Sequence, residues 1–354
     1  MPLKLGNGGH SQENYDPKTG KYVESENSSS NEDNRESFPL KESSEKITFD
    51  DIIKKKKQEL SNNNNVNKPE EKPVVPEKKE LPPIETMGMY DLQKEINDNL
   101  RFFRQQGIII HEMAGHPFFN GDLKLACANW RQLRRLIETF PVDLNGCKFV
   151  NSTRYQEGTG NWAYMQGEYP YSARLYEYLE ATWKVEYKPN AKMNFNVKKF
   201  RSYEQNTMDT KRNSESGWWV QCDDSMYCVQ SLTHEFGHAL HNQIFGDYLR
   251  SQNSDGKIMA IITKDSGSNG MKKQKKEFVE GLRKEIYEIY NEKRGIFKDE
   301  ISYYGFITKI SDYGKKNVLE WWAETFSNMM CGKPTLEAEA MKEYLKRKGY
   351  MRGE

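Results

Sequence analysis

The sequence predicts an α+β protein, in which amphipathic helices and a few short strands form one folded domain behind a long polar N-terminal region. Two observations predict the domain. Apolar residues recur every three to four positions through much of the region 88–350, and they alternate in a short stretch at 193–197. A third observation sets the limit of the domain, because residues 1–86 contain almost no large apolar side chains.

The N-terminal region, residues 1–86, has the composition of a disordered segment. It contains three serines at 28–30, four asparagines at 62–65, and several prolines among lysines and glutamates. Such a segment buries too little apolar surface to offset the entropy that it would lose on ordering. Within it, residues 48–60 place apolar side chains on one side of a short helix, which is either a docking peptide or a transient, solvated helix.

Three helices of the domain, which we expect to span 88–350, are predicted by their apolar spacing. The first ends at Gly107, and the second is stopped by Pro141. The apolar positions are Leu92, Ile96, Leu100 and Phe103 in the first helix, Leu123, Ala126, Trp130, Leu133, Ile137 and Phe140 in the second, and Phe278, Leu282, Ile286 and Ile289 in the third.

Two segments between these helices are predicted strands. Apolar residues alternate at 193–197, and 217–220 contains two adjacent tryptophans followed by a valine. A polar stretch near 251–276 fits neither pattern, and we interpret it as an insertion.

Residues His234 to His238 read His-Glu-Phe-Gly-His and match His-Glu-x-x-His, a pattern of zinc peptidases. The surrounding residues 229–245 are apolar at helical spacing and contain no proline. Residues four apart on a helix lie about 40° apart around the axis and roughly 6 Å apart along it, so both imidazoles can reach one metal ion. Glu235 lies beside that point, where it suits a base acting on water better than a ligand. The alternative is a helix whose two histidines only form a polar patch.

A similar stretch, His111-Glu-Met-Ala-Gly-His116, fails the same test. Its histidines are five residues apart, which leaves the two rings roughly 140° apart around a helix. Gly115 and Pro117 also disfavour a helix there. We therefore expect His111 and His116 to be loop or structural residues.

A catalytic zinc needs a third protein ligand. His241 lies on the same helical face as the motif, but about 10 Å along the axis from His234, so we expect it to contact a ligand or to pack rather than to bind the metal. Glu320 and Glu324 are better placed, since they are four apart on a helix expected from Asn317. The other side of this expected helix is apolar, with Val318, Trp321, Trp322, Phe326 and Met329. Two carboxylates on such a helix either meet a cation or a donor, or form a solvated acidic stripe.

These two motifs together resemble a known family. His-Glu-Phe-Gly-His-Ala, followed by Tyr-Gly-x-x-Asn-x-x-Glu-x-x-Ala-Glu-x-Phe, is similar to the catalytic domain of anthrax lethal factor and to the lethal-factor-like metallopeptidase domains at the C-terminal end of some phage minor head proteins. The resemblance is specific at the motifs and extends more loosely over residues 120–348. It implies a zincin-like fold, with Glu320 as the third zinc ligand and Tyr313 pointing into the active site. Glu324 would then orient a histidine ligand.

The resemblance implies a zinc-dependent metalloendopeptidase that hydrolyses protein or peptide substrates. Glu235 would take a proton from water activated by Zn²⁺ and deliver it to the leaving amine, and Tyr313 would donate a hydrogen bond to the oxyanion. The segment 218–220 would pair with an extended substrate by strand addition.

Two alternatives remain at the level of biology. In place of an enzyme associated with a phage or mobile element, the chain is either a phage virion structural or assembly protein, with a zinc-binding domain of little or no proteolytic activity, or an effector delivered into another cell. The complete set of ligand, base and tyrosine positions favours an enzyme. Residues 14–23 have a faint likeness to short tags of phage structural proteins, so a phage head or another assembly partner is a candidate for binding the N-terminal region.

The composition excludes some classes of partner. The 53 lysines and arginines balance the 52 aspartates and glutamates, and with no base-reading motif we expect no nucleic-acid partner. Five cysteines without a Cys-x-x-Cys pair fit a reducing compartment; Cys222 and Cys228 either pair or remain thiols. No apolar run has the length of a membrane span, and residues 1–30 lack the core of a signal peptide. We therefore expect a cytoplasmic chain, with a virion as its alternative destination.

Overall fold

The computed structural model describes residues 14–16, 21–23, 81–112, 117–144, 147–152, 163–166, 192–196, 198–251, 268–295 and 301–352. The chain forms two compact units, residues 1–46 and 47–354. In the first unit, strands β1 (Asn14–Asp16) and β2 (Lys21–Val23) pair in antiparallel fashion, so the region that we expected to be disordered contains a strand pair. The helix expected at 48–60 lies outside the described residues.

The second unit is mostly helical and contains a four-stranded sheet in the order β3-β4-β6-β5, which confirms the α+β class. Strands β3 (Ile109–His111), β4 (Lys148–Ser152) and β6 (Lys192–Asn196) are parallel to one another. Strand β5 (Ala163–Gln166) runs antiparallel to β6.

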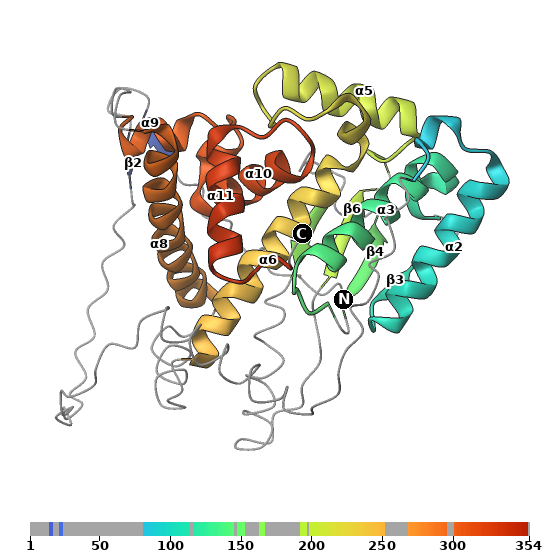
Figure 1. The fold of residues 1–354 in the computed structure, drawn as a ribbon, viewed down its shortest axis with the longest axis horizontal. Helices are drawn as coiled ribbons and strands as arrows, with labels where there is room; N and C mark the ends of the chain where they lie inside the picture. Colours follow the sequence, from blue (N-terminus) through green and yellow to red (C-terminus); the bar gives the residue numbers. More distant parts are fainter. Residues whose placement is uncertain are drawn as a thin grey trace, which may run out of the picture. The chain divides into compact units, whose positions relative to one another are not determined.

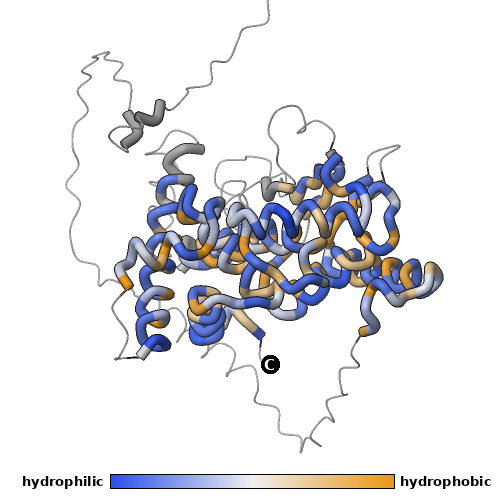
Figure 2. The backbone as a smooth tube through the Cα atoms, turned by 90° about the horizontal axis from the view of Figure 1, so that it is seen from above, coloured by the Kyte–Doolittle hydropathy of each residue, from blue (hydrophilic) through white to orange (hydrophobic). Residues whose placement is uncertain are grey.

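Helix α6 (Gln230–Ser251) occupies the middle of this unit (Figure 1). The sheet and α3 (Leu123–Thr139) lie on one side of it, and α10 (Val318–Met330) and α11 (Leu336–Arg347) on the other. The other α-helices within the described residues are α2 (Met89–Gln105), α5 (Tyr203–Glu215), α8 (Ser268–Arg294) and α9 (Tyr303–Thr308). Hydrophilic and hydrophobic stretches follow one another at short intervals along the helices (Figure 2), as expected for helices with one buried side.

The periodic helices are confirmed. The three predicted from apolar spacing are α2, α3 and α8, and the helix that carries the His-Glu-x-x-His motif is α6. Helix α10 begins where the sequence suggests, because the Asn317 side chain accepts hydrogen bonds from the backbone N–H groups of Leu319 and Glu320.

The segment 217–220 is not a strand, contrary to the prediction. The backbone N–H groups of Trp218 and Trp219 both bond to the Asn213 carbonyl at the end of α5, and the Gly217 and Trp218 carbonyls accept from Asp312 and Tyr313. These bonds bend the chain and occupy the groups that a strand ladder would use. Strand addition of a substrate to 218–220 is therefore also wrong.

Two predicted boundaries shift. Residues 268–276 of the expected insertion form the first turns of α8, while 252–267 lie outside the described residues. The folded unit also includes residues 81–86, which we expected to be disordered. Ile84 is buried, and the Arg131 guanidinium donates to the Pro82 carbonyl at 2.8 Å.

The cysteines do not form the Cys222–Cys228 pair considered above, because all five are free and buried. Cys222 instead packs with Cys331 and Tyr227 in a small buried cluster at the end of α10. Buried thiols of this kind behave as small apolar side chains.

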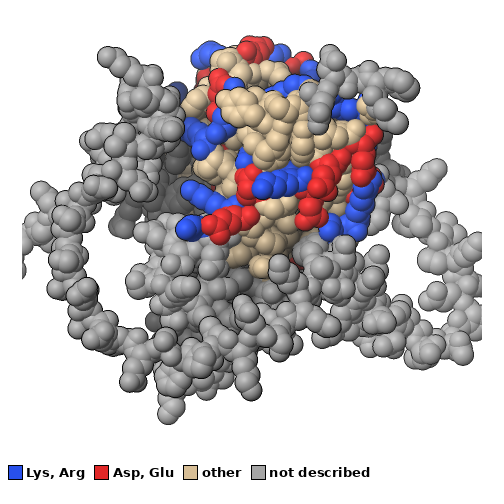
Figure 3. Space-filling view, turned by 90° about the vertical axis from the view of Figure 1, so that its left-hand side faces the viewer, with Lys and Arg blue, Asp and Glu red and all other residues tan. Residues whose placement is uncertain are grey.

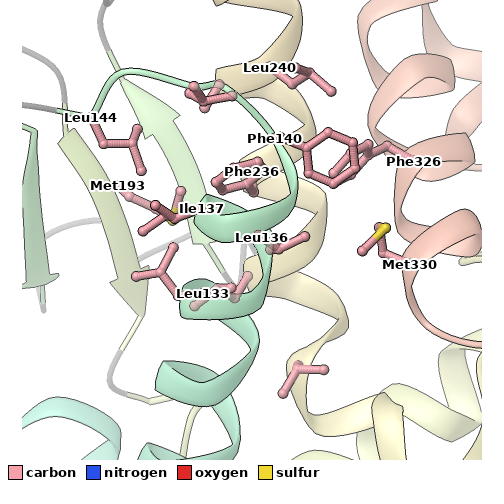
Figure 4. Close-up of a cluster of buried hydrophobic side chains, with 14 of the residues drawn as sticks. Leu133, Leu136, Ile137, Phe140, Leu144, Met193, Phe236, Leu240, Phe326 and Met330 are labelled. Carbon is pink, nitrogen blue, oxygen red and sulfur yellow. The ribbon is translucent and has the colours of Figure 1, made fainter. Parts of the chain in front are cut away.

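The main core fills the space where α3, α6, α10 and the sheet meet (Figure 4). The Phe140 ring lies 6.1 Å from Phe236 and 5.0 Å from Phe326, centroid to centroid. Phe236 and Phe326 stack 6.0 Å apart across the junction of α6 and α10. Because Phe236 is part of the His-Glu-x-x-His motif, the core fixes α6 at the motif itself.

The surface carries charges of both signs. On the face in Figure 3, acidic and basic residues lie next to one another. Exposed pairs include Arg347 with Glu292 at 3.0 Å and Arg134 with Glu138 at 2.9 Å. Within the described residues, no helix is long and apolar enough to span a membrane.

Candidate metal centre

Three side chains from α6 and α10 converge at one point. The ligand atoms of His234, His238 and Glu320 all lie within 4.8 Å of one another, so the group could hold a metal ion. Glu320 Oε2 lies 3.1 Å from His234 Nε2 and 3.4 Å from His238 Nε2. His234 is buried, and the other two side chains are partly buried.

The close approach of α6 to α10 brings these side chains together. Gly237, inside the motif, faces α10 directly, because a Cβ built there would lie 3.0 Å from Ala323 Cα and 3.2 Å from Phe326 Cδ1. A hydrogen atom in place of a side chain therefore sets the distance between the two helices. At that distance, Glu320 on α10 reaches both His234 and His238 of α6.

Glu324, one helical turn after Glu320, orients His234 from the far side of the ring. Its Oε1 lies 2.8 Å from His234 Nδ1. Its Oε2 accepts hydrogen bonds from the Val220 N–H at 3.0 Å and the Ser311 hydroxyl at 2.8 Å. The buried carboxylate is thus satisfied at both oxygens, and His234 Nε2 is turned toward the centre.

His241 orients the His238 ring through its Nδ1 atom, as Glu324 orients the His234 ring. His238 Nδ1 lies 3.0 Å from His241 Nε2, and His241 is 1% exposed. His241 belongs to no metal-ligating group among the described side chains, in agreement with its expected role beside a ligand. Burial and the neighbouring His238 lower the pKa of His241 well below 6.5, which keeps its ring neutral and able to accept a hydrogen bond.

The donor set fits a cation. When the Nδ1 atoms of His234 and His238 donate to Glu324 and His241, both Nε2 atoms present lone pairs to Glu320 Oε2. Lone pairs at this separation repel one another unless a proton or a metal ion lies between them. The side chains present therefore suit a metal ion, because they offer one carboxylate and two imidazoles, and each imidazole is oriented by a further partner.

The pKa values show how strongly the centre attracts positive charge. Burial lowers the pKa of His234, but hydrogen bonds to Glu320 and Glu324 raise it more, so that it lies well above 6.5. Burial raises the pKa of Glu320, but hydrogen bonds and charge from His234 and His238 lower it more, so that it lies far below its usual range. Glu320 is therefore ionised at any physiological pH.

Glu235 and Tyr313 lie near the same point, because Glu235 follows His234 in α6 and its charge acts on both His234 and Tyr313. Glu235 is buried at 6% exposure, and the Tyr313 ring lies 5.6 Å from the His234 ring. Burial raises the pKa of Tyr313, and the charges of Glu320, Glu235 and Glu324 raise it further. The Tyr313 hydroxyl is therefore protonated at neutral pH and able to donate a hydrogen bond.

Every site residue predicted from the sequence lies at this centre, on α6, on α10 or just before α10. His111 of the rejected motif is exposed at the end of β3, and His116 lies outside the described residues. Sequence reasoning missed Ser311 and the Val220 N–H, both bound to Glu324, because neither belongs to a motif. No protein-family model and no curated protein matches the chain, and no solved structure matches it.

Proposed function

We propose that the protein is a zinc-dependent endopeptidase of the zincin class. One observation carries the proposal: two histidines and a glutamate from two helices point their ligand atoms at one place, with a buried glutamate next in sequence to the first histidine. A centre that only stabilised the fold would have no use for Glu235.

Zinc suits this donor set better than the other common ions. Two imidazoles and one carboxylate are a ligand set of catalytic zinc, whereas Mg²⁺ and Ca²⁺ prefer oxygen ligands. Ligands about 2.1 Å from a tetrahedral zinc lie roughly 3.4 Å from one another. The 3.1 and 3.4 Å separations of Glu320 Oε2 from the two Nε2 atoms are close to that spacing. His234, His238 and Glu320 would thus hold the ion with three protein ligands, the number typical of catalytic rather than structural zinc.

When bound, zinc would supply a Lewis acid that polarises the scissile carbonyl and makes water more acidic. Glu235 takes the proton from the attacking water and delivers it to the nitrogen of the leaving amine. Tyr313 donates a hydrogen bond to the oxygen that becomes negative at the scissile carbon, a contribution of about 3 kcal/mol in comparable sites. Glu324 and His241 hold the two histidine rings in place.

An extended peptide is the substrate that the surroundings favour. Strand β5 lies at the edge of the four-stranded sheet and packs against α6, the helix that carries the centre. An edge strand beside a catalytic centre can align a substrate backbone through ladder hydrogen bonds. We therefore assign substrate pairing to β5 and not to 218–220, because the backbone groups of 218–220 are already bonded within the protein.

Metal analysis tests the centre. We expect about one zinc per chain by elemental analysis of protein purified without added metal, and we expect Glu320→Ala to release it. Substoichiometric zinc that excess zinc does not restore would contradict the assignment. Zinc retained by Glu320→Ala would show that another side chain is the third ligand.

Glu235→Gln tests the chemistry separately from the metal. The variant keeps the shape of the side chain but cannot take a proton, so zinc content and unfolding temperature should match the wild type while hydrolysis falls by a factor of about 10² to 10⁴. Tyr313→Phe should lose less activity, since it removes only one hydrogen bond. A broad peptide library read by mass spectrometry provides the assay. If the wild type and Glu235→Gln are equally inert, an assembly role replaces the enzymatic one.

A further inference from the structure

Beside the candidate centre, the Lys316 ammonium lies over two aromatic rings. Its Nζ is 4.2 Å from the centroid of Tyr313 and 4.8 Å from that of Trp218. The two rings meet edge to face, with centroids 5.7 Å apart. Trp218 is 41% exposed, although tryptophan is usually well buried. An exposed cation and an exposed aromatic surface thus lie together.

Backbone bonds hold this group in a fixed arrangement. The Tyr313 N–H donates to the Trp218 carbonyl at 3.0 Å, and the Asp312 N–H donates to the Gly217 carbonyl at 2.9 Å. The Trp218 N–H in turn bonds to the Asn213 carbonyl at the end of α5. The two segments that contribute the side chains are therefore joined at the backbone, and little ordering would be needed on binding a ligand.

Lys316 also differs from its neighbour in its charge partners. Lys315 forms an ion pair with Asp312 at 2.6 Å. Lys316 has no carboxylate partner among the described residues, where its charge is met only by the two rings. A cation over an aromatic face keeps its other side open to a further partner.

We infer that Lys316 and Trp218 form a specificity subsite that binds a carboxylate of the substrate next to the scissile bond. The inference rests on the proposed endopeptidase function, and the Tyr313 ring links the subsite to the centre, since it touches Lys316 on one side and His234 on the other. Lys316 pairs with the carboxylate, while Trp218 covers the methylene groups that carry it. The carboxylate belongs either to an acidic side chain or to the C-terminus of the peptide.

Matched peptides test the subsite. Starting from a library peptide that the wild type cleaves, glutamate and glutamine are placed in turn on either side of the scissile bond, with an amidated C-terminus. We expect kcat/KM to be about fivefold higher for glutamate, the size of effect that a partly exposed ion pair provides. Lys316→Met should abolish this ratio, whereas Lys315→Met, the matched control, should preserve it. The Lys316→Glu variant should cleave a peptide with lysine at the same position faster than the glutamate peptide.

A second series gives the same peptides a free or an amidated C-terminus close to the scissile bond. A preference for the free acid that Lys316→Met abolishes supports the subsite and assigns it to a terminal carboxylate. Binding supplies a readout independent of turnover: a fluorescently labelled glutamate peptide should bind the zinc-loaded Glu235→Gln protein about fivefold more tightly than its glutamine counterpart. That difference should vanish when Lys316→Met is added.

The outcomes separate the two proposals. No cleavage of any peptide by the wild type overturns the endopeptidase and the subsite with it. If the wild type prefers neither glutamate over glutamine nor a free over an amidated C-terminus, or if Lys316→Met leaves these preferences unchanged, the subsite alone is overturned. If Lys316→Met lowers kcat for all peptides equally, Lys316 only positions Tyr313, and the subsite is likewise overturned.

Discussion

At the scale of single residues, the orientation of His234 depends on donors and acceptors that face one another correctly. Glu324 accepts at both oxygens: one faces His234 Nδ1, and the other faces the Val220 N–H and the Ser311 hydroxyl. A carboxylate is the side chain that suits this position, because it offers acceptors only.

Glu324→Gln should therefore damage the centre without changing the size of the side chain. The glutamine NH₂ group must face either the Val220 N–H or His234 Nδ1, and in the second case it favours the tautomer whose Nε2 carries a proton and cannot bind a metal. We expect zinc affinity to fall 10- to 100-fold in a competition titration with a chelator. Glu339→Gln, on the exposed side of α11, is the control and should bind zinc like the wild type.

His241→Ala should have a milder effect than loss of a ligand. It removes the partner of His238 Nδ1 but none of the three ligating side chains. Zinc should remain bound at stoichiometric concentration, with an affinity reduced by about tenfold. We expect complete release of zinc for Glu320→Ala. Complete release in His241→Ala would instead show that His241 is a ligand.

The raised pKa of His234 predicts a pH dependence for protein stripped of metal by a chelator. A histidine whose pKa is higher in the folded state contributes stability that is present in full below its unfolded value near 6.5 and is lost as the pH rises through its folded value. Zinc binds the His234 ring nitrogen only after that nitrogen has lost its proton, so the stabilisation that added zinc provides should increase with pH. In thermal unfolding, the increase in Tm on adding zinc should be larger at pH 8.5 than at pH 6. An increase that shrinks with pH would contradict the assignment of His234 as a ligand.

At the scale of secondary-structure elements, the contact of α6 with α10 determines whether the ligands meet. Gly237→Ala places a methyl group 3.0 Å from Ala323 Cα, and crowding of this kind costs about 1–3 kcal/mol. Gly281→Ala in α8 is the control, since a Cβ there meets nothing within 4 Å and should stabilise the helix by about 0.5–1 kcal/mol.

Denaturant unfolding and zinc titration measure the two effects. Gly237→Ala should lower the unfolding free energy and weaken zinc binding together, because displacement of α10 carries Glu320 away from α6. Gly281→Ala should raise the free energy and leave zinc binding unchanged. Equal behaviour of the two variants would mean that α10 adjusts to the methyl group without strain.

The elements also show which parts of the structure a sequence can predict. Helices α6 and α10 follow from spacing within the chain, and so does the placement of His234 with His238 on one helix face and of Glu320 with Glu324 on another; the roles of the two glutamates are implied only by the resemblance of the motifs to a known family. The bond from Ser311 to Glu324 joins a loop to a helix face, and no periodic pattern encodes such a contact. At 217–220, the strand preference of two tryptophans is overridden by hydrogen bonds to the end of α5.

At the scale of the whole molecule, the folded unit begins before the periodic sequence does. Ile84 stands among prolines without a helical or strand pattern around it, yet it is buried, and Glu85 accepts a hydrogen bond from the Tyr203 hydroxyl. Single anchoring residues of this kind are not detectable from periodicity.

Two truncations test this boundary. A chain that starts at residue 81 should retain zinc and the stability of the full protein. A chain that starts at 88 loses Ile84 and the Pro82 and Glu85 contacts, and should be less stable by about 2–4 kcal/mol in denaturant unfolding. Zinc should remain bound in both, since neither deletion touches α6 or α10. If the two truncated chains are equally stable, residues 81–87 do not belong to the folded unit.

Both ring nitrogens of His234 contact carboxylates from consecutive turns of α10, so a metal ion bound at this centre would be thermodynamically linked to the packing of that helix. Such a linkage is reciprocal: the metal ion would stabilise the packing of α10, and better packing of α10 would strengthen metal binding. Core residues that are not ligands, such as Met330 of α10 in the apolar cluster of Figure 4, should therefore influence metal affinity without touching the ion. In a cell, scarcity of the metal would then shorten the lifetime of the protein by leaving α10 more open to degradation.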